Sequence, residues 1–365
     1  MPEPWRFCVV AYAVTRAVVA AGILTCGLVT GRPASVRAAA YRWDGFWYLH
    51  IARVGYSRSL RAPLPGVAHR FSVWAFFPAF SGLVSAVHAI TRLPLDVAGI
   101  VLSLAAGLAA VRAVFALGEE YAGVATGRAA AVLICAWPGS AAFGLPYSEG
   151  LAVAATAAAL VLLLRRRWWW AGVAGALATA TRATGVAVLA AAAVTAGVEV
   201  ARERRLQPLA APLLTAVGLA AFLGYGWART GDVLVWRHAE NLWHQQFNLG
   251  YPMYVHWVRG LTTGVRVWGV LLEIVGMAAL VTFAVVARKR WGRLTLPMGA
   301  YAIVAAVLIL GYSAVGTRPR MVLGLVPGFV WLAAWLPRRL VMRVALGCLP
   351  VLYATSFLWM WKVTP

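Results

Sequence analysis

Apolar stretches of membrane-spanning length follow one another along almost the whole chain, and this constrains the fold more than any other feature. A helix that crosses a bilayer needs about 20 mostly apolar residues. Stretches of this kind occur at 7–29, 71–91, 97–118, 148–164, 209–228, 267–287, 294–315, 321–336 and 343–361. Of the 365 residues, 62% are hydrophobic and 12% are charged, whereas soluble domains have about 45–50% and about 25%. A soluble enzyme is excluded, and we expect one all-α domain over residues 1–365 with about 9–11 membrane segments.

The basic residues are concentrated in short clusters between the apolar stretches. Lys and Arg number 33 against 11 Asp and Glu, which gives a net charge of +22. Such clusters retain loops in the cytoplasm and contact anionic head groups, so we expect membrane lipids rather than nucleic acid as partners. The four cysteines are far apart, without C-x-x-C spacing, and do not form a disulfide or metal set. The first apolar stretch lacks a small-residue cleavage site, so we expect it to be retained.

Two apolar stretches are interrupted. Residues 129–147 contain Trp137-Pro138-Gly139 and Gly144-Leu145-Pro146, so any helix there should be broken. Residues 171–200 form one apolar run that is interrupted by the sequence TRATG at 181–185, and basic clusters at 165–167 and 202–205 flank it. About 30 helical residues extend about 45 Å, which is too short for two crossings. We therefore expect a re-entrant hairpin with its tip at Arg182 and both ends in the cytoplasm.

Two long loops contain most of the aromatic and ionisable residues outside the apolar stretches. They cover residues 30–70 and 229–264. Further basic clusters at 288–293 and 338–343 should be cytoplasmic by the positive-inside rule. Counting crossings from these clusters places both long loops on the extracytoplasmic side, provided that 129–147 does not cross fully.

The first long loop contains the most informative acidic residue, Asp44. Residues 42–56 read RWDGFWYLHIARVGY. Asp44 and Tyr48 lie four residues apart in a helix and can line one pocket. Asp44 could activate a hydroxyl group of a lipid-borne substrate as a general base, or it could simply cap the helix N-terminus. A different face, expected in the membrane interface, carries Trp43, Phe46, Trp47, His50, Ile51 and Val54.

Two other charged residues are candidates because of their depth in the membrane. Glu149 follows Pro146-Tyr147-Ser148 at the top of a span, where an acid is a functional candidate, although a carboxylate also suits the first turn of a helix. Arg182 either binds a substrate or bonds to carbonyl groups of the broken helix. The second loop adds Trp243 and three histidines, His238, His244 and His256. No H-E-x-x-H motif is present, so we expect no metal and no cofactor.

Several motifs, in the same order, resemble those of the PIG-V-like mannosyltransferases, which have the GT-C membrane fold. RWDGFWYLHIARVGY, followed by WAFFPAF at 74–80, resembles their RWD-x-x-WY-x-x-IA-x-x-GY stretch and the AFFP segment after it. The sequence from Trp137-Pro138 to LPYSE at 145–149 resembles their FP…YSE segment. TRATG resembles their TRPTG, with Ala183 in place of the usual proline. Pro319-Arg320-Met321 and the later Val326-Pro327 resemble their PRY…FP. The resemblance covers most of the chain, and its first motif is the most specific.

This resemblance implies an inverting glycosyltransferase at the extracytoplasmic face. It implies transfer of mannose from a polyprenyl (or dolichyl) phosphate carrier to a lipid-linked acceptor, with Asp44 as the catalytic base. The leaving phosphate is already acidic, so it needs cations, and arginine supplies them bidentately. As substrate-binding residues we expect Arg42, Trp43, Tyr48, Glu149, Arg182, Trp243, His244 and Arg320.

Two other functions stay open at this point. The chain could use a different polyprenyl-phospho-sugar, or it could transport a lipid or sugar without covalent chemistry. Broken helices and intramembrane arginines are typical of transporters, but no internal inverted repeat is evident. The Ala- and Arg-rich composition is typical of a high-GC bacterium such as an actinobacterium. The acceptor would then be a glycolipid such as an inositol-phospholipid mannoside or a lipoglycan.

Overall fold

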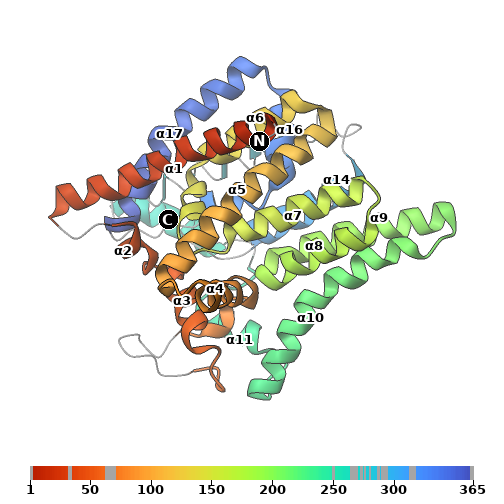
Figure 1. The fold of residues 1–365 in the computed structure, drawn as a ribbon, viewed down its shortest axis with the longest axis horizontal. Helices are drawn as coiled ribbons and strands as arrows, with labels where there is room; N and C mark the ends of the chain where they lie inside the picture. Colours follow the sequence, from red (N-terminus) through yellow and green to blue (C-terminus); the bar gives the residue numbers. More distant parts are fainter. Residues whose placement is uncertain are drawn as a thin grey trace.

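The computed structural model describes residues 3–31, 35–61, 71–248, 251–263, 295–311 and 318–361, together with isolated positions between 270 and 288. The secondary structure over these residues is helical throughout (Figure 1). In chain order, the elements are α1 (Glu3–Thr30), α2 (Val36–Ala40), α3 (Asp44–Val54), η1 (Val73–Ala75), α4 (Pro78–Thr91), α5 (Leu95–Ala122), α6 (Val124–Ala136), η2 (Pro138–Gly144), α7 (Glu149–Leu164), α8 (Trp168–Thr181), η3 (Ala183–Gly185), α9 (Val186–Glu203), η4 (Gln207–Leu209), α10 (Ala210–Thr230), α11 (Val235–Leu242), α12 (Tyr251–Thr263), α14 (Leu296–Gly311), α15 (Arg318–Val322), α16 (Val326–Trp335) and α17 (Arg338–Trp361).

Five helical segments among the described residues are long and apolar enough to cross a membrane. They are Glu3–Thr30, Leu95–Ala122, Ala183–Glu203, Gln207–Thr230 and Arg338–Trp361. The pair η2 and α7, bent by 103°, adds a sixth if it forms one span, and α4, α6, α14 and α16 are shorter apolar helices. The span expected at 71–91 is instead the short turn η1 followed by the 14-residue α4. Most of the span expected at 267–287 lies outside the described residues.

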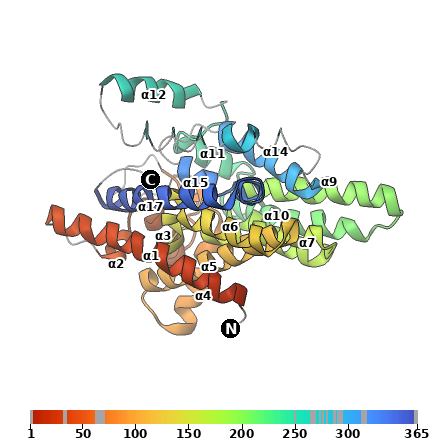
Figure 2. The ribbon, with the colours of Figure 1, turned by 90° about the horizontal axis from the view of Figure 1, so that it is seen from above.

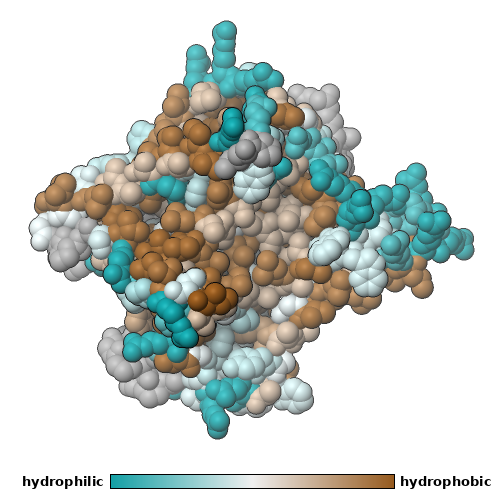
Figure 3. Space-filling model, in the orientation of Figure 1, coloured by the Kyte–Doolittle hydropathy of each residue, from teal (hydrophilic) through white to brown (hydrophobic). Residues whose placement is uncertain are grey.

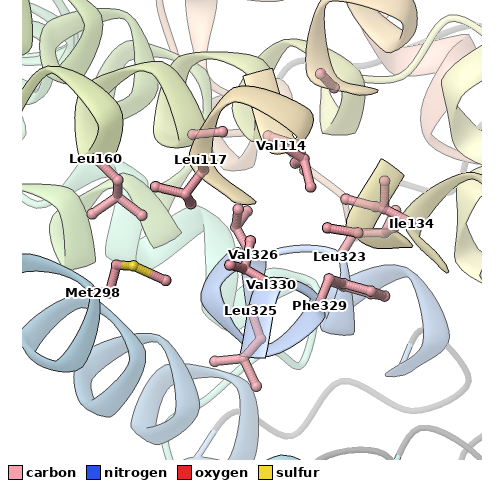
Figure 4. Close-up of a cluster of buried hydrophobic side chains, with 14 of the residues drawn as sticks. Val114, Leu117, Ile134, Leu160, Met298, Leu323, Leu325, Val326, Phe329 and Val330 are labelled. Atoms are coloured by element: carbon pink, nitrogen blue, oxygen red, sulfur yellow. The ribbon is translucent and has the colours of Figure 1, made fainter. Parts of the chain in front are cut away.

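The main core forms where α15 and α16 pack against the middle of the bundle. Figure 4 shows Leu323, Val326 and Phe329 facing Leu117 and Ile134 from α5 and α6. Elsewhere the helices approach through small residues. A Cβ on Gly118 would lie 2.9 Å from the Cα of Gly127, so α5 and α6 are in backbone contact there. In a membrane, where apolar burial adds little, such close packing supplies much of the helix association.

The helix is interrupted at Pro138, as the sequence predicted. Helix α6 ends at Ala136, the 3-10 segment η2 covers Pro138–Gly144, and α7 begins at Glu149. The guanidinium of Arg16 in α1 holds this segment by donating to the carbonyl oxygen of Ser140 at 2.5 Å. A Cβ on Gly139 would overlap the carbonyl oxygen of Pro319, so η2 also lies directly against the start of α15. The predicted break is confirmed, and it joins two distant parts of the chain.

The hairpin expected over 171–200 is also confirmed. Helices α8 and α9 run in opposite directions on either side of Arg182 (Figure 1). Arg166, before α8, forms ion pairs with Glu199 and Glu203 near the end of α9. The two basic clusters therefore lie at the same end of the molecule. One arm, Ala183–Glu203, has the length and hydropathy of a span by itself, whereas α8 does not.

Further ion pairs gather at this same end. Arg165 binds Glu120 at the end of α5 with an Nε–Oε2 distance of 2.7 Å, and Arg128 binds Glu3. Hydrophilic residues crowd the tip where α9 and α10 meet, at the right of Figure 3. Figure 2 shows the same tip extending away from the rest of the bundle. Helix α7 begins at Glu149 and ends beside Arg165, so about 24 Å of helix separates the two ends.

Candidate active site

A cavity of about 320 Å³ lies at the other end of α7. Its walls come from α3, α7, α11, α14, α15 and the segment between α8 and α9. One part is charged and is lined by Asp44, Glu149, Arg182, Glu240 and Arg320. The other part is apolar and includes Val153, Leu308, Ile309, Leu323 and Val326. A cavity with these two parts fits a ligand that has a charged head and a hydrocarbon chain.

Backbone geometry places Asp44 at the edge of this cavity. Trp43 has a φ of 53°, in the left-handed region that bulky residues rarely adopt, and it turns the chain into α3. A Cβ on Gly45 would overlap the carbonyl oxygen of Ala40, so only glycine fits the next position. The backbone N–H of Asp44 donates to the Tyr147 hydroxyl at 3.1 Å. This turn fixes the first residue of α3, and strain of this kind is common at functional sites.

The Asp44 carboxylate is paired with an arginine and does not cap α3. Its Oδ2 lies 2.7 Å from Nη1 of Arg320. The residue at the N-cap position of α3 is Trp43, and no side-chain hydrogen bond caps the helix there. The alternative that Asp44 acts only as a cap is therefore wrong.

Glu149 joins two arginines into one buried network. Its Oε1 lies 3.0 Å from Nε of Arg320 and 2.7 Å from Nη1 of Arg182, and its side chain is only 4% exposed. The Arg320 guanidinium also lies over the Tyr147 ring, 5.0 Å from the ring centroid. Removal of one partner from such a cluster would leave a buried charge uncompensated. The carboxylate is in the first turn of α7 as well, so the helix-dipole and functional interpretations of Glu149 coexist.

The side chain of Arg182 contacts side chains rather than the carbonyl groups of the broken helix. Besides Glu149, it donates to Oγ of Ser148 at 3.2 Å. The same hydroxyl is 2.6 Å from the Tyr48 hydroxyl. Tyr48 and Asp44 both line the cavity, as their four-residue spacing predicted. The hairpin tip is thereby tied to α3 and α7.

Helix α11 from the second long loop closes the cavity. Trp236, Glu240 and Trp243 lie at positions i, i+4 and i+7, and all three line the cavity. The indole N–H of Trp243 donates to the carbonyl oxygen of Ser72 at 3.0 Å, which fastens α11 to the first loop. Glu240 was not among the residues expected in the site. The signal that could have found it is a lone acid between two tryptophans on one helical face.

The aromatic face of α3 packs inside the protein, not in the membrane interface. The Trp47 ring centroid is 5.1 Å from that of Trp243 and 5.9 Å from that of Phe76, and its side chain is buried. Ile51 is buried as well, whereas Val54 is exposed. Trp47 therefore does not face lipid as expected, because the second loop folds over the face that an amphipathic pattern alone assigns to lipid.

Three of the expected substrate-binding residues are not among those that line the cavity. The indole N–H of Trp43 donates to the carbonyl oxygen of Trp359 in α17 at 3.4 Å. Arg42 contributes its backbone carbonyl, which accepts from the Tyr147 hydroxyl at 3.3 Å. His244 has a φ of 55° and follows α11. Their positions flank the site, and the cavity itself contains Asp44, Tyr48, Glu149, Arg182, Trp243 and Arg320.

The histidines do not converge on one point in the part of the chain that is described. His238 pairs with Asp232, with an Nδ1–Oδ2 distance of 2.7 Å, beside the start of α11. The side chain of His256 lies outside the described residues. Among those that are described, no three His, Cys, Asp or Glu side chains are grouped as metal ligands would be.

Comparison with solved structures identifies the fold class. Crystal structures of ArnT from Cupriavidus metallidurans, bound to undecaprenyl phosphate and in the apo state, align with TM-scores of 0.56 and 0.54. Each alignment has 14% sequence identity and covers 93% of this chain and 62% of ArnT. The chain thus matches somewhat less than two thirds of ArnT. The all-α GT-C-like fold expected from the sequence is confirmed.

The sequence itself gives no further identification. No family model matches it, and no curated protein does.

Proposed function

We propose that the chain is a membrane glycosyltransferase that moves a sugar from a polyprenyl-phosphate carrier to a lipid-linked acceptor. The observation that carries the proposal is the Asp44–Arg320–Glu149–Arg182 network at the wall of a cavity that also has an apolar part. It offers a carboxylate as base and two arginines as ligands for a phosphate. These are the groups that transfer from a lipid phosphate requires.

In this mechanism Asp44 takes the proton of the acceptor hydroxyl as that oxygen attacks the anomeric carbon of the sugar. The new bond joins the acceptor oxygen to this carbon on the face opposite the phosphate. The bond from the anomeric carbon to the phosphate oxygen breaks, and its electron pair leaves with the polyprenyl phosphate. The configuration is inverted. Arg182 and Arg320 stabilise the added charge on the phosphate and stay protonated throughout.

The apolar part of the cavity is suited to the isoprenoid chain. Leu308 and Ile309 come from α14, and Leu323 and Val326 come from the segment after Arg320. The ArnT crystal structure with undecaprenyl phosphate supports the same class of carrier for this chain. The head of such a lipid would lie at the arginines while its tail contacts these side chains.

Mannose is the donor sugar that the RWD, YSE and TRATG motifs favour. A transferase for another polyprenyl-phospho-sugar would use the same network, so the sugar must be identified by assay. A transporter is disfavoured because it needs no base beside a pair of arginines. The acceptor that we infer is a glycolipid such as an inositol-phospholipid mannoside or lipoglycan. We place the reaction on the extracytoplasmic side, because the cavity is at the opposite end of α7 from the basic clusters.

The test is transfer of labelled mannose from polyprenyl-phospho-mannose to glycolipid acceptors by the purified protein in lipid nanodiscs. Asp44→Asn should lower the rate by about 10²- to 10⁴-fold, the usual contribution of a general base, while the protein still folds. A variant that keeps more than about a tenth of the wild-type rate would remove Asp44 from the mechanism. Mass spectrometry of glycolipids from a deletion strain identifies the acceptor. If the wild-type protein moves intact lipid across a bilayer without transfer, the transporter interpretation replaces this one.

A further inference from the structure

Glu240, the acidic residue of the cavity that the sequence did not predict, differs from Asp44 and Glu149 in its ion pairing. Asp44 and Glu149 are both ion-paired with arginine. Glu240 forms no ion pair with any residue that the structure describes, although it lines the same cavity. Its side chain projects from α11, which packs against η1 and α10. Apart from the neighbouring Trp236 side chain, with which it interacts, this carboxyl group is available to contact a ligand in the cavity.

Glu240 lines the cavity together with the residues of the proposed reaction centre. Arg182 and Asp44 line the same cavity as Glu240, and the charges of both side chains act on its carboxyl group. In an inverting transfer from a lipid phosphate, the sugar must lie between exactly these two groups. A carboxyl group that lines the cavity near both residues can therefore contact the sugar. Trp236 and Trp243 flank it on the same helical face, and aromatic faces beside a polar group are well suited to a sugar ring.

We propose that Glu240 hydrogen-bonds hydroxyl groups of the transferred sugar and so determines which sugar the cavity accepts. This proposal rests on the proposed function and names the residue of the second loop that recognises the donor. Burial in the cavity raises the pKa of the Glu240 carboxyl to about 8. Arg182 opposes this increase, Asp44 adds to it, and a hydrogen bond with Trp236 also opposes it. At neutral pH the group is therefore protonated, so it both donates and accepts a hydrogen bond. A sugar hydroxyl has the same two capacities.

The other ionisable groups near α11 do not replace Glu240 in this role. Glu149 is paired with Arg320, and the Tyr48 hydroxyl is hydrogen-bonded to Ser148. From α10, Arg229 donates to the carbonyl oxygen of Tyr56, and Tyr225 packs against the ring of Tyr56. The segment η1 contributes no ionisable side chain. On α11 itself, Arg237 is exposed and His238 is paired with Asp232, and His244 follows the helix.

A pair of substitutions separates sugar recognition from catalysis. Glu240→Ala should raise KM for polyprenyl-phospho-mannose about 10- to 100-fold, the cost of one or two hydrogen bonds, with a smaller effect on kcat. Glu240→Gln keeps one donor and one acceptor, so it should recover most of the loss in KM. Wild-type KM should rise as the pH passes about 8, where Glu240 loses its proton, and Glu240→Gln should remove this rise. A collapse of kcat in Glu240→Gln would make Glu240 a base and overturn the proposal.

Binding of two lipids distinguishes failure of this proposal from failure of the proposed function. Glu240→Ala should weaken the binding of polyprenyl-phospho-mannose but not of polyprenyl phosphate, which has no sugar. Equal effects on both lipids, or none on either, would overturn the role of Glu240 alone. A wild-type protein that binds neither lipid would overturn the proposed function as well. Asn241→Ala, on the exposed side of the same helix, controls for the folding of α11, and Glu119→Ala, at the far end of α5, controls for loss of a glutamate.

Discussion

Arginine–carboxylate pairs occur at both ends of α7, but they are built differently. At the cavity end, Arg320 and Glu149 are 9% and 4% exposed, and each carboxylate there shares its arginine with another charged group. At the other end, Arg166 is 50% exposed, and its partners Glu199 and Glu203 are 18% and 35% exposed. Buried charges are costly unless they are fully paired, whereas exposed pairs contribute little. Both ends contain ion pairs, so it is the burial of Arg320 and Glu149 that distinguishes the candidate active site from a solvated surface.

The largest expected effect is an all-or-none difference in cysteine labelling. It tests whether the cavity end and the basic-cluster end of α7 lie on opposite sides of a membrane. In a background without the four native cysteines, Ser59→Cys in the first loop should react with an impermeant maleimide on intact spheroplasts. Arg205→Cys, beside the end of α9, should react only after lysis. The arginines of the first loop oppose the simple charge rule, so the outcome is informative. If both positions react alike, the proposed extracytoplasmic site is wrong.

The next largest effect compares one arginine from each end. Arg320→Met should abolish measurable transfer and destabilise the protein by about 3–5 kcal/mol, because Asp44 and Glu149 lose a shared buried partner. Arg166→Met should leave transfer unchanged and shift the unfolding transition only slightly, because its pairs are exposed. Transfer assays and thermal unfolding in detergent measure both variants. Similar losses in the two variants would contradict the distinction between the two ends.

An intermediate effect is expected from a glycine that joins η2 to α15. Gly139→Ala would push the new Cβ against the Pro319 carbonyl, next to Arg320, and should cost about 1–3 kcal/mol. We expect transfer to fall about tenfold, which corresponds to about 1.4 kcal/mol in the barrier. Gly82→Ala is the matched control, because a Cβ on Gly82 would meet no atom within 4 Å and α4 gains a better helix former. If Gly139→Ala leaves the transfer rate unchanged, this contact does not position Arg320.

The smallest expected effect is that of chelation. Asp44 and Glu149 in the cavity are paired with arginines, and the phosphate leaving group needs cations that Arg182 and Arg320 supply. EDTA should therefore leave the transfer rate unchanged. Loss of activity that Mn²⁺ or Mg²⁺ restores would direct attention to Glu149, Asp232 and the histidines of the second loop.

The features that depend only on neighbouring residues could be predicted from the sequence. Pro138 breaks a helix wherever it occurs, and the basic clusters at 165–167 and 202–205 required a hairpin with Arg182 at its tip. The four-residue spacing of Asp44 and Tyr48 was enough to put both on one cavity wall.

Contacts between distant parts of the chain were beyond such reasoning. An amphipathic face has the same pattern whether lipid or a folded loop covers it, so the burial of Trp47 by Trp243 could not be foreseen. Arg320, which pairs with Asp44, follows directly on the contact of Gly139 with Pro319, and both interactions join residues far apart in sequence.

The balance of charge in the Asp44–Arg320–Glu149–Arg182 network has a consequence for turnover. The charges of two arginines paired with two carboxylates sum to zero, so this network offers an incoming anion no unpaired cation. The anion must displace the protein's own carboxylates from the arginines, and this exchange lowers its net affinity. A pair of unopposed arginines would hold the spent lipid phosphate, which carries more charge than the donor, and would stall the cycle. Built-in counter-ions instead give the departing phosphate a competitor, and they favour rapid release over tight retention.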